Sequence, residues 1–147
     1  MRFALILLLV SSLSCNRESR APEPPYQYAN DFKAYFKDTY NLELQKNSKY
    51  FVVPLNSCSE CVDSALQNLA IKKFDWTVLL VGQTEDSIRQ KNIVAVKQNY
   101  TCLIDSTLLM NEYALGIGLP SLLQTDNRGI VITKTDFFYG SWESFKP

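Results

Sequence analysis

The cysteines carry the clearest chemistry in this 147-residue chain, which has four of them and no histidine. Cys58 and Cys61 are separated by two residues. A pair at this spacing can close a small disulfide ring across the first turn of a helix, where unpaired N–H groups and the helix dipole favour negative charge. A thiolate is stabilised there, so the pKa of the first cysteine can fall from about 8.5 towards 7 or below. The spacing predicts that Cys58 is a nucleophile and that Cys61 resolves its mixed disulfide.

The same cysteines have two other possible uses. A zinc site takes four ligands, and without histidine the chain offers it only Cys58, Cys61 and Cys102, so no metal is expected. A purely structural disulfide is the more serious alternative, because exported proteins contain such bridges routinely. A bridge between residues i and i+3 closes a very short loop and constrains the unfolded chain little, which makes stabilisation a poor reason to have one. Redox chemistry is therefore the preferred interpretation.

A strand, a turn and a helix are predicted to position the pair. Residues 49–55 (KYFVVPL) are rich in β-branched and aromatic types, which predicts a buried strand. Pro54 should end it, because proline cannot donate to a β ladder. Asn56 and Ser57 follow as a turn, and from Cys58 the apolar residues take a helical period. The apolar face of this helix consists of Val62, Ala65, Leu66, Leu69 and Ala70.

The rest of the chain alternates helical and strand patterns. Aromatic residues at helical intervals between positions 32 and 40 predict an amphipathic helix with Asn30 or Asp31 as N-cap. Further strands are predicted over 76–81, 101–104, 121–125 and 130–133, and further helices over 84–97 and 108–115. Near-continuous apolar strands separated by helices indicate an α/β fold with a parallel sheet covered on both faces. Residues 126–129 have the composition of a hairpin turn.

Composition limits the possible partners. Fifteen Lys and Arg residues balance fifteen Asp and Glu residues, which argues against electrostatically driven binding to nucleic acid, since that needs a basic face to displace counterions. The absence of histidine excludes Ser-His and Cys-His catalysis and histidine-ligated metals. Cys102 lies in an apolar strand, where we expect a small buried hydrophobe; a regulatory or resolving thiol is the alternative.

The first residues have the pattern of an export signal. Arg2 precedes a short apolar run, and small polar residues then lead to Cys15. The run is too short to cross a bilayer as a helix, which takes about 20 residues. Residues 12–15 (SLSC) resemble the lipobox of bacterial lipoproteins, in which the cysteine is acylated and becomes the mature N-terminus. Ordinary cleavage, leaving a soluble secreted protein, is the alternative.

Three regions follow from these patterns. Residues 1–14 are expected to be a signal peptide, and residues 15–29, which contain three prolines, a lipidated tether. Residues 30–147 are expected to form a single domain, as the chain length suggests. The location expected is the bacterial cell envelope, with the lipid anchor holding the domain on the periplasmic or outer side.

The predicted strand, CxxC pair and helix together resemble the thioredoxin-like superfamily over about residues 49–133. Residues 118–121 (GLPS) precede a predicted strand, at a place where that superfamily carries a cis-proline facing the CxxC. The resemblance implies a thioredoxin-like central sheet flanked by helices, a cis bond at Pro120, and a substrate groove shaped by Leu119 and Pro120. X-Pro is the one peptide bond for which the cis form is cheap. Residues 103–120 look like the TlpA-like, membrane-anchored branch, which has an extra strand-helix insertion.

The sequence also departs from that family. Ser57 stands where the family usually has tryptophan, no proline separates the cysteines, and the segment after residue 133 is short for the closing helix. The expected function is thiol–disulfide exchange with exported thiol or disulfide proteins, by a monomer without cofactor. A binding module of the same fold with a structural Cys58–Cys61 bridge is the alternative. A peroxide-reducing thiol enzyme is less favoured, because Leu55 stands where its threonine would be.

Overall fold

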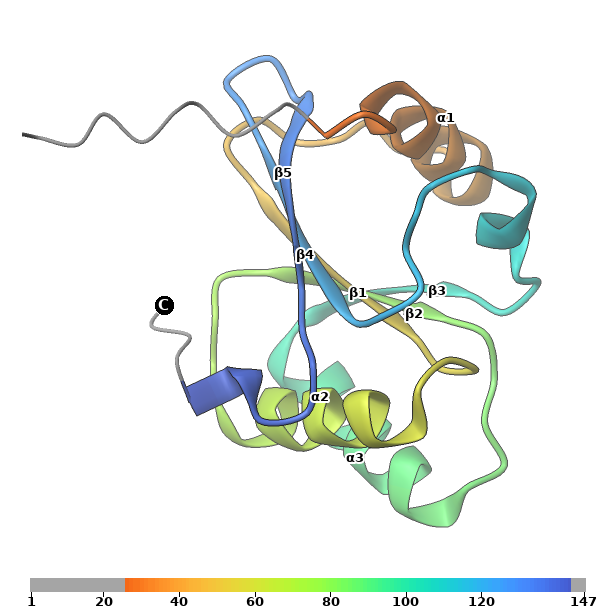
Figure 1. Cartoon of the computed structure of the whole chain (residues 1–147), viewed down its shortest axis with the longest axis vertical. Coiled ribbons are helices and arrows are strands. Elements are labelled where there is room, and N and C mark those ends of the chain that lie inside the picture. The colour runs from red at the N-terminus through yellow and green to blue at the C-terminus, as the bar shows by residue number, and fades with distance from the viewer. Residues whose placement is uncertain (1–25, 144–147) are drawn as a thin grey trace, which may run out of the picture.

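Five strands form one mixed sheet in the order β3-β2-β1-β4-β5 (Figure 1). The computed structural model describes residues 26–143, so the predicted signal peptide and Cys15 lie outside the described residues. The strands are β1 (Lys49–Pro54), β2 (Thr77–Val81), β3 (Thr101–Asp105), β4 (Ser121–Thr125) and β5 (Val131–Asp136). The predicted positions of these strands are thus confirmed to within a few residues at their ends.

The central strand, β1, has a parallel neighbour on one side and an antiparallel neighbour on the other. β2 runs parallel to β1 with Val52 opposite Leu79, and β3 runs parallel to β2. β4 runs antiparallel to β1 with Ser121 opposite Val52, and β5 completes a hairpin with β4. The α/β class and the hairpin are confirmed. The expectation of a parallel sheet holds only for β1 to β3, because the connection over residues 106–120 brings the chain to the other side of β1 with its direction reversed.

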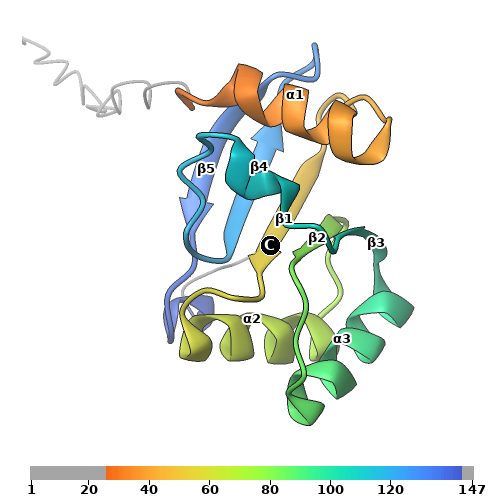
Figure 2. The same ribbon diagram turned by 90° about the vertical axis from the view of Figure 1, so that its right-hand side faces the viewer.

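Helices cover both faces of the sheet, as Figures 1 and 2 show. They are α1 (Ala29–Tyr40), α2 (Ser59–Ile71), α3 (Ser87–Asn99) and the short 3-10 helices η1 (Leu109–Glu112) and η2 (Ser141–Glu143). Side chains alternate along β1, so Phe51 and Val53 pack in the cluster that contains α2 and Val96 of α3. Tyr50 and Val52 pack on the opposite face with α1 and Met110 of η1. Each side of the sheet therefore has its own apolar core.

Two of the predicted helical features are wrong. The helix predicted over residues 108–115 is only the turn η1, because Leu108 has a left-handed backbone (φ 60°) and Gly116 another (φ 59°). Asn30 and Asp31 lie inside α1 rather than capping it, since the amide of Phe32 already donates to the carbonyl of Tyr28. Before α1, Tyr26 donates its hydroxyl to the carbonyl of Leu115.

Within residues 26–143 no helix combines the length and apolarity needed to cross a bilayer.

Candidate functional site

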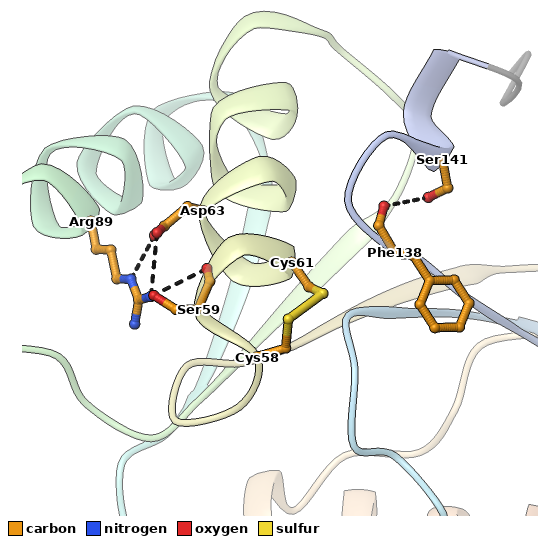
Figure 3. The surroundings of a disulfide bond; sticks show 7 residues. All are labelled: Cys58, Ser59, Cys61, Asp63, Arg89, Phe138 and Ser141. Carbon is orange, nitrogen blue, oxygen red and sulfur yellow. Dashed lines mark hydrogen bonds and ion pairs between the residues drawn. A yellow bond between two sulfur atoms is a disulfide. The ribbon is translucent and has the colours of Figure 1, made fainter.

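The two cysteines of the CxxC pair lie at the start of α2 and form a disulfide, with 5.3 Å between their Cα atoms (Figure 3). Cys58 is the N-cap residue and is exposed, whereas Cys61 lies one turn inside the helix and is only 7% exposed. The predicted strand, turn and helix around the pair are confirmed. The difference in exposure means that a large reagent or protein reaches the sulfur of Cys58 first.

The first turn of α2 has backbone donors to spare. The earliest helical hydrogen bond runs from the amide of Val62 to the carbonyl of Cys58, and Cys58 makes no side-chain cap bond. The amides of Ser59, Glu60 and Cys61 have no protein acceptor within residues 26–143. Unpaired N–H groups at a helix start carry partial positive charge. When the disulfide is reduced, this charge favours the thiolate form of Cys58.

A tight turn connects β1 to Cys58. The amide of Ser57 donates to the carbonyl of Pro54 at 3.0 Å, and the amide of Leu55 donates to the carbonyl of Val81 at 2.8 Å. Pro54, which has no N–H to offer, is the last residue of β1, as the sequence predicted, and the Leu55 amide makes the final bond to β2. The turn is thereby fixed to both β1 and β2.

Gly82, directly after β2, packs closely against Asn56 of this turn. Its backbone is left-handed (φ 94°), and a Cβ placed on it would lie 3.1 Å from the Leu108 side chain and 3.2 Å from that of Asn56. Most residues avoid this conformation, and glycine adopts it freely. Gly118, in the segment that leads to β4, differs, because a Cβ there would meet no atom within 4 Å.

Arg89 of α3 binds the opposite side of the same helix start (Figure 3). Its Nε donates to Asp63 of α2 at 2.6 Å, and one terminal nitrogen donates to the carbonyl of Leu55 at 3.2 Å. The other terminal nitrogen donates to the hydroxyl and the carbonyl of Ser59. The Arg89 side chain is only 14% exposed, and its pKa is raised, chiefly by the hydrogen bond to Asp63. One side chain thus holds the residues before and after the turn.

Sequence reasoning missed Arg89. It lies in a helix whose apolar pattern is weak, and 31 positions (89 − 58) separate it from Cys58. The available signal was Asp86, whose carboxylate caps α3 by accepting from the amides of Ile88 and Arg89. Locating that cap would have placed Arg89 in the first turn of α3, but only the packing of α3 against α2 brings it to the cysteines.

An exposed aromatic ring lies on the other side of the disulfide. Phe138, from the loop after β5, lies across the disulfide from Arg89 in Figure 3. Its side chain is 57% exposed, and the next residue in the chain, Tyr139, is 73% exposed. A large exposed ring beside an exposed cysteine provides an apolar surface for another polypeptide.

A small pocket of about 230 Å3 opens beside the turn, between the end of β1 and the segment before β4. Asn56, Ser57, Asn111, Ile117 and Gly118 are among its lining residues. The hydroxyl oxygen of Ser57 is buried and has no hydrogen-bond partner. The pocket therefore lies next to the residue that precedes the exposed Cys58.

Pro120 corrects one prediction. Every peptide bond within residues 26–143 is trans, including the Leu119–Pro120 bond for which a cis form was expected. The carbonyl of Pro120 accepts from the amide of Phe137 at 2.7 Å, which extends the β4–β5 ladder by one step, and a trans bond continues that extended course. Pro120 is buried and Leu119 half-buried. The register that pairs Ser121 with Val52 leaves both at the same end of the sheet as Cys58.

Cys102, on β3, is apart from this site. It is a free, partly buried cysteine that packs against the core cluster containing α2. Burial raises the pKa of its thiol, and Lys97 offsets this only in part. It is therefore a weak nucleophile at neutral pH, which agrees with the small hydrophobe predicted.

Residues 26–143 contain no group of three or more Cys, Asp or Glu side chains placed to hold a metal ion. No protein-family model, curated protein or solved structure matches the chain. The candidate site therefore has to be interpreted from its own geometry: one exposed and one buried sulfur at a helix start, a clamped turn and an apolar rim.

Proposed function

We propose that this protein exchanges disulfides with other exported proteins through Cys58 and Cys61, as a thioredoxin-like domain does. The observation that carries the proposal is the asymmetry of the pair: an exposed Cys58 at an uncapped helix start, bonded to a buried Cys61. The strand β1, which leads to Cys58, is hydrogen-bonded to a parallel neighbour on one side and an antiparallel neighbour on the other, so the start of α2 is attached to the centre of the sheet. The short η2 and the trans bond at Pro120 remain departures from the family pattern.

The chemistry needs only thiols. In the reduced protein the Cys58 thiolate attacks one sulfur of a client disulfide, forming a mixed disulfide and releasing the other client sulfur as a thiolate. Cys61 then loses its proton and attacks Cys58, which releases the second client sulfur and forms the disulfide seen in the structure. Two electrons pass to the client, whose thiolates take up two protons. A dithiol protein supplies the electrons for the next cycle.

The client strand has a natural place beside Cys58. The backbone of Ile117 and Gly118 makes no hydrogen bond to the rest of the described chain, and both residues line the pocket next to Ser57. An extended client segment there would pair with this free backbone and turn its disulfide toward Cys58. Leu119 and Pro120 would fix the course of the segment, and Phe138 would pack against the client from the other side.

The proposed location is the bacterial cell envelope. Its support is the sequence of residues 1–15, with an acylated Cys15 as the anchor. Labelling with a palmitate analogue and partition into detergent should both be lost in Cys15→Ala. An unmodified Cys15 at the N-terminus of a soluble product would contradict the anchor without affecting the exchange chemistry.

Trapping tests the exchange. Cys61→Ser removes the resolving thiol, so the full-length variant should accumulate covalent adducts with envelope proteins on non-reducing gels, and mass spectrometry would identify them. Cys58→Ser should trap nothing, and Cys102→Ser, a matched control on β3, should behave like the wild type. Equal trapping by the two CxxC variants would refute the assigned roles, and no trapping by either would refute the exchange.

The reduction potential separates exchange from the alternative of a permanent structural bridge. An exchange catalyst should have a potential between about −120 and −270 mV, whereas structural disulfides lie below about −300 mV. Equilibration of the full-length protein with glutathione and dithiothreitol buffers measures this value. A potential below the catalytic range would favour a binding module over an exchange catalyst.

A further inference from the structure

We propose that Arg89 is a positioning residue for Cys58: it fixes the turn that carries the cysteine and supplies a positive charge beside the helix start. The inference rests on the proposed function, since it concerns the same thiol. It is carried by three contacts of one guanidinium group, with Leu55 before the turn, Ser59 directly after Cys58, and Asp63 one turn along α2.

Arg89 contacts one residue before Cys58 in the sequence and one residue after it. Leu55 and Ser59 bracket residues 56–58, and Arg89 binds the backbone carbonyl of each. A planar guanidinium has five donors in fixed directions, so it can hold two carbonyls and a carboxylate at once. A lysine amine, which is a compact point charge, can bind only some of these three groups at once. The segment bearing Cys58 is therefore held by α3 as well as by β1 and β2.

The positive charge of Arg89 should also favour the thiolate form of Cys58. A positive group near a thiolate lowers the thiol pKa, and the low exposure of Arg89 limits screening by solvent. Asp63 opposes this effect, because its carboxylate is also in α2 and bonds the same guanidinium. Removing Arg89 therefore leaves Asp63 unpaired near Cys58, while removing the charge of Asp63 leaves Arg89 unopposed. The two changes should move the Cys58 pKa in opposite directions.

The groups facing this helix start come from several elements. Glu60 is exposed on α2 next to the cysteines, and Asp86 caps α3 close to Arg89. On the other side Phe138, from the loop after β5, and Ser141, from η2, carry no charge (Figure 3). Arg89 is a cation bonded to residues on both sides of Cys58, which makes it the group to test.

The test is alkylation of reduced full-length protein by iodoacetamide as a function of pH, with peptide-resolved mass spectrometry to count modification at Cys58 alone. In Arg89→Gln we expect the Cys58 rate at pH 7 to fall about three- to tenfold, with a matching rise in apparent pKa of about half to one unit. Arg89→Lys should fall between Arg89→Gln and the wild type. Asp63→Asn, which leaves the charge of Arg89 unopposed, should exceed the wild-type rate.

Arg128→Gln is the matched control. Arg128 also donates from Nε to an aspartate, Asp126, at 2.9 Å, but in the turn between β4 and β5, at the end of the sheet away from Cys58. Its Cys58 pH profile should equal that of the wild type. Circular dichroism melts establish that each variant is folded. If Arg89→Gln does not fold, Arg89→Lys is compared with the wild type in its place.

Each outcome decides the inference. An unchanged pH profile in Arg89→Gln, a wild-type profile in Arg89→Lys, or an Asp63→Asn rate no higher than that of the wild type would overturn it. The reagent is a small molecule and needs no client protein. Failure here would thus leave the trapping result untouched, and failure of trapping would leave this result standing.

Discussion

The two neighbouring helices α2 and α3 have the same length of 13 residues but begin in opposite ways. At α3 the Asp86 carboxylate accepts from the amides of Ile88 and Arg89 at 2.9 and 2.8 Å. At α2 the N-cap is Cys58, and its side chain accepts no hydrogen bond. A good cap stabilises a helix by about 1 kcal/mol. The start of α2 gives up that stability and keeps its N–H groups free for charge on sulfur.

The helices also differ in how deeply they are packed. α2 buries five residues, among them Leu66 and Leu69, which are fully inaccessible to solvent, whereas α3 buries only Val96. The uncapped helix α2 is therefore stabilised mainly by its buried side chains, and the capped helix α3 mainly by its N-cap. This division allows reactivity at the start of α2 without loss of the helix.

The largest effect should come from the core side of α2. Leu66→Ala should lower the free energy of unfolding by about 2 to 5 kcal/mol, because a fully buried leucine leaves a cavity. Val94→Ala on α3, where the valine is 56% exposed, should change it by less than about 0.5 kcal/mol. Urea unfolding of the oxidised proteins measures both. Similar losses would mean that α3 is held by packing as much as α2 is.

A third helical start, that of η1, extends the comparison. Asp105 is 1% exposed, and its carboxylate accepts from the amides of Leu109 and Met110 and from the hydroxyls of Thr107 and Tyr35. Burial raises its pKa, but these hydrogen bonds outweigh burial and hold the pKa below the usual value. Asp105→Asn should lower the free energy of unfolding by about 1 to 3 kcal/mol at pH 7.

The sign of the pH dependence follows from the lowered pKa. The Asp105 contribution is complete above the unfolded pKa of about 3.9 and is lost as the pH falls through the lower folded value. The difference between wild type and Asp105→Asn should therefore shrink below pH 4. Asp75→Asn, at an exposed position before β2, is the control and should show no such change. A difference that grows with acid would reverse the assignment.

The cap of α3 should have a smaller effect. Asp86→Ala should lower the free energy of unfolding by about 1 kcal/mol and speed hydrogen exchange at the amides of Ile88 and Arg89, which lose their acceptor. Glu85→Ala, its exposed neighbour, should leave both quantities unchanged. Unaltered exchange in Asp86→Ala would show that the carboxylate is not the functional cap.

The smallest effect should come from supplying α2 with the N-cap acceptor that Cys58 does not provide. Cys58→Asp supplies the missing acceptor, so it should be more stable than Cys58→Ala by about 0.5 to 1 kcal/mol. Both variants lack the disulfide, which makes them a matched pair. Thermal unfolding of the two under reducing conditions provides the measurement, and equal melting temperatures would argue that the amides of Glu60 and Cys61 are already satisfied by solvent.

The sequence predicted what depends on local pattern. Apolar runs located the strands, Pro54 marked the end of β1, and the CxxC spacing placed Cys58 at the start of α2. Prediction failed where the apolar pattern does not determine the backbone. Left-handed conformations at Leu108 and Gly116 leave only η1 of the helix predicted over 108–115, and Pro120 is drawn into the β4–β5 ladder by the amide of Phe137. Arg89 reaches the site only through packing of α3 on α2, which periodicity in α3 does not indicate.

The lack of space at Gly82 has a consequence for how this protein tolerates mutation. A side chain there would press on Asn56, in the turn that holds Cys58, and its backbone would resist the required conformation. In a library of random variants selected for disulfide exchange, Gly82 should be as intolerant of substitution as the cysteines, although it takes no part in the chemistry. Gly118, with open space around its α-carbon, should accept many residues and is the position at which client preference can drift without cost to the fold.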